Sequence, residues 1–201
     1  MFLTKKAQLL LLSLSLCSFN ALADDNASDL NTENCVASKW KDANGNPISI
    51  DEKFGPGSMA ATRCLANTKA VKSLYQINAL CKDAACTAPY ALGNIQNHIN
   101  DLTITHGMDA DDYEIAVVVH AGGWKLVLNN NSDTPHAATN PFQSAMEAAV
   151  ANPRIKVMFC ANTAAKKGIK LSQMIPGIKF STAGVSAISD LQEEGYRYIQ
   201  P

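Results

Sequence analysis

The run YEIAVVV at residues 113–119 limits the possible folds more than any other stretch of this chain. It is apolar at almost every position and rich in β-branched residues, which is typical of a strand buried on both faces. The run IKVMF at 155–159 has the same character. Such strands occur where helices cover both faces of a parallel sheet. The two runs therefore predict an α/β protein.

Strand-like and helix-like patterns alternate along residues 70–201. Strands are expected at 70–77, 113–119, 155–159, 178–182 and 196–199, with helices at 90–102 and 142–151, after Cys160, and around Val185, Ile188 and Leu191. A short helix is also expected within 58–66. With right-handed crossovers, the alternation predicts a flavodoxin-like domain: a mostly parallel five-stranded sheet with helices on both faces, a three-layer sandwich.

Chemistry in such sheets gathers outside the carboxyl ends of the strands. Three loops are expected at this edge: one with Cys81 and Cys86, one with His120, Gly122 and Gly123, and the corner at Cys160. A doubly wound order would place the first strand between the second and the third. The loop with Cys81 and Cys86 would then lie beside Cys160.

Cys160 stands where a strand runs into a short helix, for which Asn162 or Thr163 is the expected N-cap and Gly168 the expected end. The first N–H groups of a helix and its dipole favour a thiolate over a thiol. The corner therefore suits a nucleophilic sulfur. Alternatively, Cys160 only ends a buried strand, since free cysteine is among the most buried residue types.

The first 23 residues have the pattern of a secretory signal peptide. Lys5 and Lys6 precede a short apolar run at 9–19, and Ala21 and Ala23 fit a cleavage site after Ala23. A periplasmic or secreted protein is expected, with an N-terminal extension at 24–69 and one domain at 70–201. No second apolar segment is long enough to span a membrane.

Cleavage would remove Cys17 and leave five cysteines. In an oxidising compartment, an odd number predicts two disulfides and one thiol. Cys35, Cys64, Cys81 and Cys86 lie in the first half of the chain, so the remaining thiol is most simply Cys160. The sequence leaves the connectivity open.

Composition excludes some functional classes. Lys and Arg number 17 against 18 Asp and Glu, and no basic stripe appears, so no nucleic-acid partner is expected. No cofactor is expected, and no metal, because no pair of ligands has a recognised spacing. A copper or zinc site of Cys160 with His98, His106, His120 or His136 is a weaker alternative.

The segments FCANTAAKKG, PGIKFSTAGVSAISDLQEEGYRYIQP and ALGNIQNHIND…YEIAVVVHAGGWKLVL resemble the DsrE/DsrF-like family over about residues 70–201. This resemblance implies a flavodoxin-like fold and a homo-oligomer, a trimer or hexamer. Members in sulfur-relay and sulfur-oxidation pathways carry sulfur as a persulfide on the cysteine that matches Cys160. The resemblance thus implies a sulfurtransferase or sulfur carrier. Its partner would be a sulfur donor or acceptor protein, or a small sulfur compound. Export is a departure, because the known sulfur-relay members are cytoplasmic.

Two functional hypotheses remain, from different classes. In the first, Cys160 accepts sulfane sulfur, His120 accepts a proton, and the N–H groups of Asn162 and Thr163 hold an anion such as thiosulfate. Gly122 and Gly123 would allow close approach of a ligand. His120 is alternatively a histidine with its hydrogen bonds satisfied at a strand end.

In the second hypothesis, the protein is a periplasmic ligand- or partner-binding module without turnover. Cys35–Cys64 and Cys81–Cys86 would then be structural disulfides. A variant of the first hypothesis is a thiol–disulfide switch among Cys81, Cys86 and Cys160.

Overall fold

Residues 34–132 and 139–201 are described by a computed structural model of the protein. The predicted signal peptide lies outside the described residues. Five strands form one sheet in which every pairing is parallel. They are β1 (Val71–Ile77), β2 (Tyr113–Val119), β3 (Ile155–Cys160), β4 (Lys179–Ser181) and β5 (Arg197–Ile199). The predicted α/β class and the parallel sheet are confirmed.

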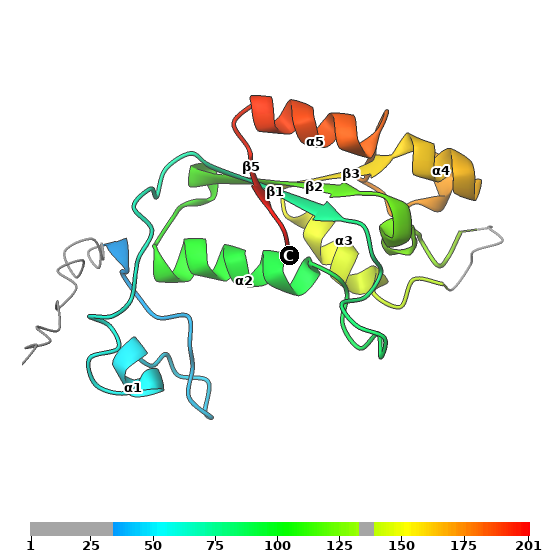
Figure 1. The fold of residues 1–201 in the computed structure, drawn as a ribbon. Coiled ribbons are helices and arrows are strands. Elements are labelled where there is room, and N and C mark those ends of the chain that lie inside the picture. The colour runs from blue at the N-terminus through cyan, green and yellow to red at the C-terminus, as the bar shows by residue number, and fades with distance from the viewer. Residues whose placement is uncertain (1–33, 133–138) are drawn as a thin grey trace, which may run out of the picture.

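Helices cover both faces of this sheet and complete three layers (Figure 1). On one face lie α2 (Leu92–Asn100) and α3 (Gln143–Ala151), and on the other α5 (Gly184–Glu193) packs on β1 and β2. The short α4 (Ala161–Lys167) follows β3 directly. Shorter turns complete the domain: a π-helix at Asp101–Thr105, and 3₁₀ segments at Ala110–Asp112, Ala121–Val127 and Leu171–Gln173. No helix of the described residues has the length and apolar character needed to cross a membrane.

The strand order is β4-β3-β2-β1-β5, which corrects one expectation. The chain moves across the sheet in one direction from β1 to β4, and only β5 returns to the far side of β1. Right-handed crossovers therefore place α2 and α3 on one face and α5 on the other. Because β2 separates β1 from β3, the loop with Cys81 and Cys86 does not adjoin the Cys160 corner.

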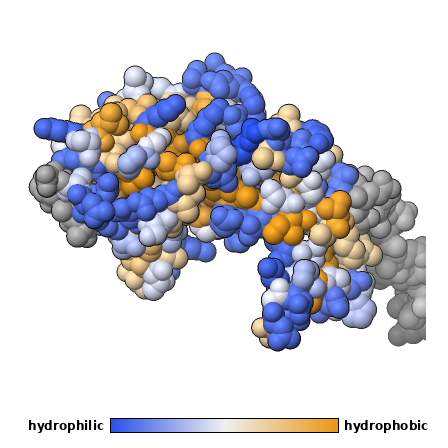
Figure 2. All heavy atoms as spheres, turned by 180° about the vertical axis from the view of Figure 1, so that it is seen from behind, coloured by the Kyte–Doolittle hydropathy of each residue, from blue (hydrophilic) through white to orange (hydrophobic). Residues whose placement is uncertain are grey.

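The core forms around β2, as its composition predicts. Ile115 through Val119 are fully buried, and so is Phe159 on the neighbouring strand. Seen from behind the view of Figure 1, the surface shows hydrophobic residues gathered across its middle, with hydrophilic ones around them (Figure 2). Large hydrophobic side chains that remain exposed include Phe180 of β4, Val185 of α5 and Leu171 of the last 3₁₀ segment.

Residues 34–69 form a segment with little regular structure. The helix expected within 58–66 is absent, and the helix of this segment is instead α1 (Ile50–Phe54). Its start is fixed by a capping box, in which the Ser49 hydroxyl accepts the Glu52 N–H and the Glu52 carboxylate accepts the Ser49 N–H. Residues 58–66 contain no comparable reciprocal cap among the hydrogen bonds found there.

Candidate functional site

The junction of β3 and α4 places Cys160 at the carboxyl edge of the sheet. Cys160 is itself the N-cap of α4, so the expectation that Asn162 or Thr163 would cap this helix is wrong. The helix begins at the first residue after the strand, and Asn162 and Thr163 lie in its first turn. Gly168 ends the helix with φ 66°, as expected.

Hydrogen bonds around the Cys160 sulfur favour its ionised form. Burial raises the pKa of this thiol, since the residue is only 5% exposed. Hydrogen bonds from the N–H and hydroxyl of Thr163, and from the N–H groups of Gly184 and Asn162, outweigh burial and lower the pKa below its ordinary value. Donors that point at a sulfur stabilise negative charge on it. The corner therefore holds a thiolate more readily than an exposed cysteine does.

Gly184 closes this corner from a third element, the start of α5. Its N–H reaches the sulfur, and its Cα faces the ring of His120. A Cβ at position 184 would stand 3.1 Å from His120 Cβ and 3.2 Å from Cγ. Sequence reasoning did not assign Gly184 a role. The sequence feature that could have indicated it is the glycine of the Gly184-Val185 pair, where α5 begins.

His120 directly follows β2, and its side chain lies next to Gly184. Its Nε2 is 2.5 Å from the side-chain amide nitrogen of Gln76, and the Gln76 oxygen accepts a hydrogen bond from the Tyr198 hydroxyl. An amide donor at Nε2 requires an unprotonated nitrogen there. Burial also lowers the pKa of His120, which favours the neutral ring. The described residues show no hydrogen bond between His120 and Cys160.

The segment after β2 turns sharply toward the corner. The left-handed residue of this turn is Ala121, with φ 45°, and not one of the two glycines. Gly122 and Gly123 are needed for another reason: a Cβ on either would come 2.7 Å from a backbone oxygen, of Asn78 and Ile77 respectively. Both glycines therefore allow the turn to pack closely on the end of β1.

A cavity of about 430 Å³ opens between this turn and α4. It is lined by Ala121, Gly122, Trp124, Asn162, Thr163, Lys166 and Lys167. The ammonium of Lys167 lies 5.2 Å from the centre of the Trp124 ring. Three of the predicted ligand-binding residues thus line one cavity, while Gly123 is buried and is not part of its lining. Two lysines give the opening a positive charge.

The model of the DsrE/DsrF-like family matches residues 76–201. The chain belongs to this family. A solved structure of similar fold is the protein of unknown function MTH1491 from Methanobacterium thermoautotrophicum. It is 19% identical, with 65% of this chain and 99% of that chain covered, at a TM-score of 0.49. No curated protein matches the sequence.

Four other cysteines in the described part of this DsrE-like protein form two disulfides, Cys35–Cys64 and Cys81–Cys86. Their Cα atoms are 5.6 Å and 4.9 Å apart, within the usual range. Cys160 is the free thiol among the described cysteines. The prediction of two disulfides and one free thiol from the five cysteines after Ala23 is therefore confirmed for the described residues.

Within the described residues, the histidines considered as metal ligands do not form a ligand cluster with Cys160. His98 Nδ1 lies 2.9 Å from the Tyr75 hydroxyl, and His106 lies beside Cys35 and Leu65. His136 falls outside the described residues. Among the described residues, no group of three potential ligands includes Cys160.

Proposed function

We propose that this protein is an exported sulfur carrier, or sulfurtransferase, that holds sulfane sulfur as a persulfide on Cys160. The observation that carries the proposal is a free thiol whose pKa is lowered by hydrogen bonds from Thr163, Gly184 and Asn162. Membership of the DsrE/DsrF-like family supports it, because relatives in sulfur-relay pathways use a cysteine at the matching corner.

The loading step needs only a nucleophilic sulfur and a donor. With thiosulfate, the Cys160 thiolate attacks the outer sulfur, a new S–S bond forms, and sulfite leaves with the electron pair of the broken bond. The product is a persulfide anion, which the same hydrogen bonds that favour the thiolate would stabilise. The step requires no external oxidant and no cofactor.

The cavity beside Thr163 is where we place the donor. Lys166 and Lys167 supply positive charge for an anion, and Asn162 and Thr163 lie between this cavity and the sulfur. His120 contacts Gly184, which in turn hydrogen-bonds Cys160. Its role as a proton acceptor stays a prediction, and a low pKa suits a group that is to take up a proton only transiently.

Sulfite release tests this function. Wild-type protein incubated with thiosulfate under non-reducing conditions should release close to one sulfite per chain, and Cys160→Ser should release none. Lys166→Gln with Lys167→Gln should slow release without lowering the final yield. Sulfite release that is unchanged in Cys160→Ser would overturn the proposal.

The second candidate is a binding module without turnover. The burial of Cys160 favours it, since a residue that is 5% exposed is hard for a donor to reach. In that case the cavity of about 430 Å³ would bind a small anion reversibly. Thiosulfate would then bind wild type and Cys160→Ser equally well by calorimetry, and no sulfite would appear.

Export and assembly are parts of the same proposal. Cleavage after Ala23 fits a chain whose described part carries two disulfides. The exposed Phe180 of edge strand β4 and the exposed Val185 offer apolar surface for a homo-oligomer. N-terminal sequencing of the exported protein should begin at Asp24. Light scattering should give a trimer or hexamer; a monomer would contradict the assembly.

A further inference from the structure

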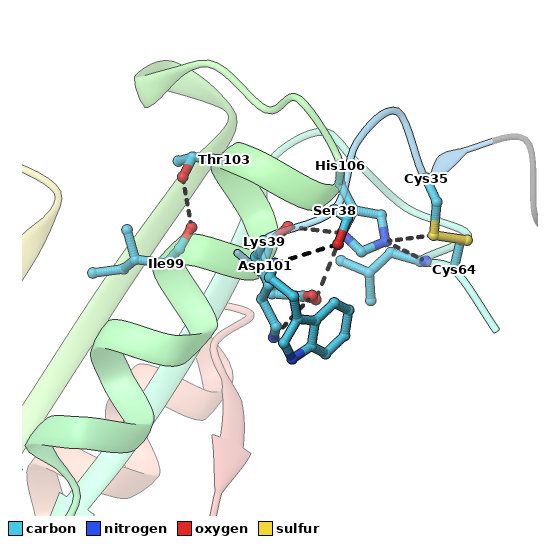
Figure 3. A network of polar contacts seen from close by, with 10 residues as sticks. Cys35, Ser38, Lys39, Cys64, Ile99, Asp101, Thr103 and His106 are labelled. Carbon is cyan, nitrogen blue, oxygen red and sulfur yellow. Dashed lines mark hydrogen bonds and ion pairs between the residues drawn. A yellow bond between two sulfur atoms is a disulfide. The ribbon is translucent and has the colours of Figure 1, made fainter. Parts of the chain in front are cut away.

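Three potential metal ligands converge at the end of the sheet opposite Cys160. Cys35, Cys64 and His106 come from the N-terminal segment, from the chain before β1, and from the end of the π-helix after α2 (Figures 1 and 3). Their ligand atoms all lie within 4.8 Å of one another. The cysteines are 29 residues apart, and His106 is 71 residues from Cys35. These separations do not match a sequence motif that would predict the cluster.

The His106 ring is oriented as a metal-binding histidine is. Its Nδ1 lies 2.9 Å from the Asp101 carbonyl oxygen and 3.5 Å from the Asp101 carboxylate, so Nδ1 carries the hydrogen. The lone pair of Nε2 therefore accepts the Leu65 N–H at 3.0 Å, and this nitrogen lies 3.9 Å from the Cys35 sulfur (Figure 3). Metal-binding histidines usually donate their other N–H to a carboxylate or carbonyl in this way.

The distances fit a tetrahedral metal ion. Around zinc, a thiolate sulfur and an imidazole nitrogen are separated by about 3.6 Å, and two thiolate sulfurs by about 3.8 Å. The sulfur of Cys35 and Nε2 of His106 are already 3.9 Å apart. The two sulfurs must separate, which follows from opening the disulfide, and Nε2 must exchange the Leu65 N–H for the metal. His106 is 7% exposed and Cys64 is 1% exposed, so competing water has little access.

Hydrogen bonds keep Cys35 at this place independently of the disulfide. The Asn34 side chain donates to the Leu65 carbonyl at 2.6 Å. The N–H groups of Val36 and Ala37 donate to the Thr105 carbonyl at 2.8 Å and 3.3 Å. These bonds tie both sides of Cys35 to the residues next to Cys64 and His106. A reduced site would therefore stay assembled.

We propose that Cys35, Cys64 and His106 form a redox-gated site for zinc or a similar thiophilic divalent ion. In the oxidised state the disulfide blocks the site, and Nε2 accepts the Leu65 N–H at 3.0 Å. A dithiol opens the disulfide and becomes a cyclic disulfide itself, leaving two thiols. The metal then displaces both thiol protons, replaces the Leu65 N–H at Nε2, and keeps one position for water.

The test uses the full chain with Cys17, Cys81, Cys86 and Cys160 changed to serine, so that only Cys35 and Cys64 remain. The reduced protein should bind one Co²⁺ per chain, with the visible bands of tetrahedral cobalt and a thiolate charge-transfer band. Added Zn²⁺ should displace the cobalt and protect both thiols from alkylation. The oxidised protein should bind neither ion.

Two variants separate the site from unspecific binding by cysteines. His106→Asn keeps a donor toward Asp101 but removes Nε2, and it should abolish the tetrahedral spectrum. Asp101→Ala should weaken binding about 10- to 100-fold, as loss of such a partner usually does. The proposal is overturned if the reduced protein binds no metal, whether or not circular dichroism shows the segment folded. Binding that is unchanged in His106→Asn would also overturn it.

Discussion

The amide nitrogen of Ala121 lies 3.1 Å from the hydroxyl oxygen of Thr163, and this hydrogen bond ties the turn after β2 to the helix that begins at Cys160. Because the same hydroxyl also bonds the Cys160 sulfur, Thr163 connects the wall of the cavity to the proposed nucleophile. The two elements that form the site are therefore held together at the residue that stabilises the thiolate.

Loss of the Thr163 hydroxyl should raise the pKa of Cys160. A hydrogen bond to a charged group contributes about 1.5–3 kcal/mol, which corresponds to a rise of about one to two pKa units in Thr163→Val. Thr163→Ser keeps the hydroxyl and is the matched control. The measurement is the rate of Cys160 alkylation against pH, with the disulfides intact. If Thr163→Val and Thr163→Ser had the same dependence of alkylation rate on pH, the hydroxyl would not act on the sulfur.

An added methyl group at Gly184 should disturb both the fold and the corner. In Gly184→Ala, the new Cβ would press on the His120 ring and displace the N–H that reaches Cys160. We expect a loss of about 1 kcal/mol in the free energy of unfolding, together with slower sulfur loading. Gly93→Ala is the control, since position 93 lies in α2 with open space around it. It should gain about 0.5–1 kcal/mol. Similar effects of both substitutions would contradict the packing argument.

The lowered pKa of Cys160 predicts a pH-dependent stability. A group whose pKa is lower in the folded than in the unfolded state stabilises the fold when it is ionised. This contribution is complete above the ordinary thiol pKa and is lost as pH falls through the lowered pKa of the folded state. Urea unfolding of wild type and Cys160→Ser should thus show a difference that grows with pH in this window. A constant difference would indicate an unperturbed thiol.

The two disulfides should contribute unequally to stability. In the chain-entropy model, the loop closed by Cys35–Cys64, with a separation of 29 residues, corresponds to about 3.6 kcal/mol. The loop closed by Cys81–Cys86, with a separation of 5, corresponds to about 2 kcal/mol. Double substitutions to serine, compared by denaturant unfolding, should reproduce this order. The reverse order would mean that the N-terminal segment is not part of the cooperative unit.

Local patterns predicted the strands of this protein better than the arrangement of its site. The runs at β2 and β3 are apolar over whole strands, so their position and burial follow from composition. The strand order does not, because it depends on which crossovers pack together, and the neighbourhood expected for Cys81 and Cys86 was wrong for that reason. Gln76 and Gly184 were missed because their partner, His120, is remote in sequence.

The predicted helix after Cys160 illustrates the same limit on a smaller scale. Asn162 and Thr163 are good N-cap residues, yet the cap is Cys160, two residues before Asn162 and three before Thr163, where β3 ends. Tertiary contacts at the sheet edge decide this boundary. The shift brings the N–H groups of both residues to the sulfur, which strengthens the case for a thiolate at Cys160.

The most direct test of the account is the intact mass of the unreduced protein before and after incubation with thiosulfate. We predict a mass increase of about 32 Da, one sulfur atom, that maps to the peptide with Cys160 and disappears on mild reduction. Cys160→Ala should keep both disulfides and gain nothing. An adduct that persists in Cys160→Ala, or a wild-type protein that never gains the sulfur, would contradict the proposal that Cys160 carries sulfur.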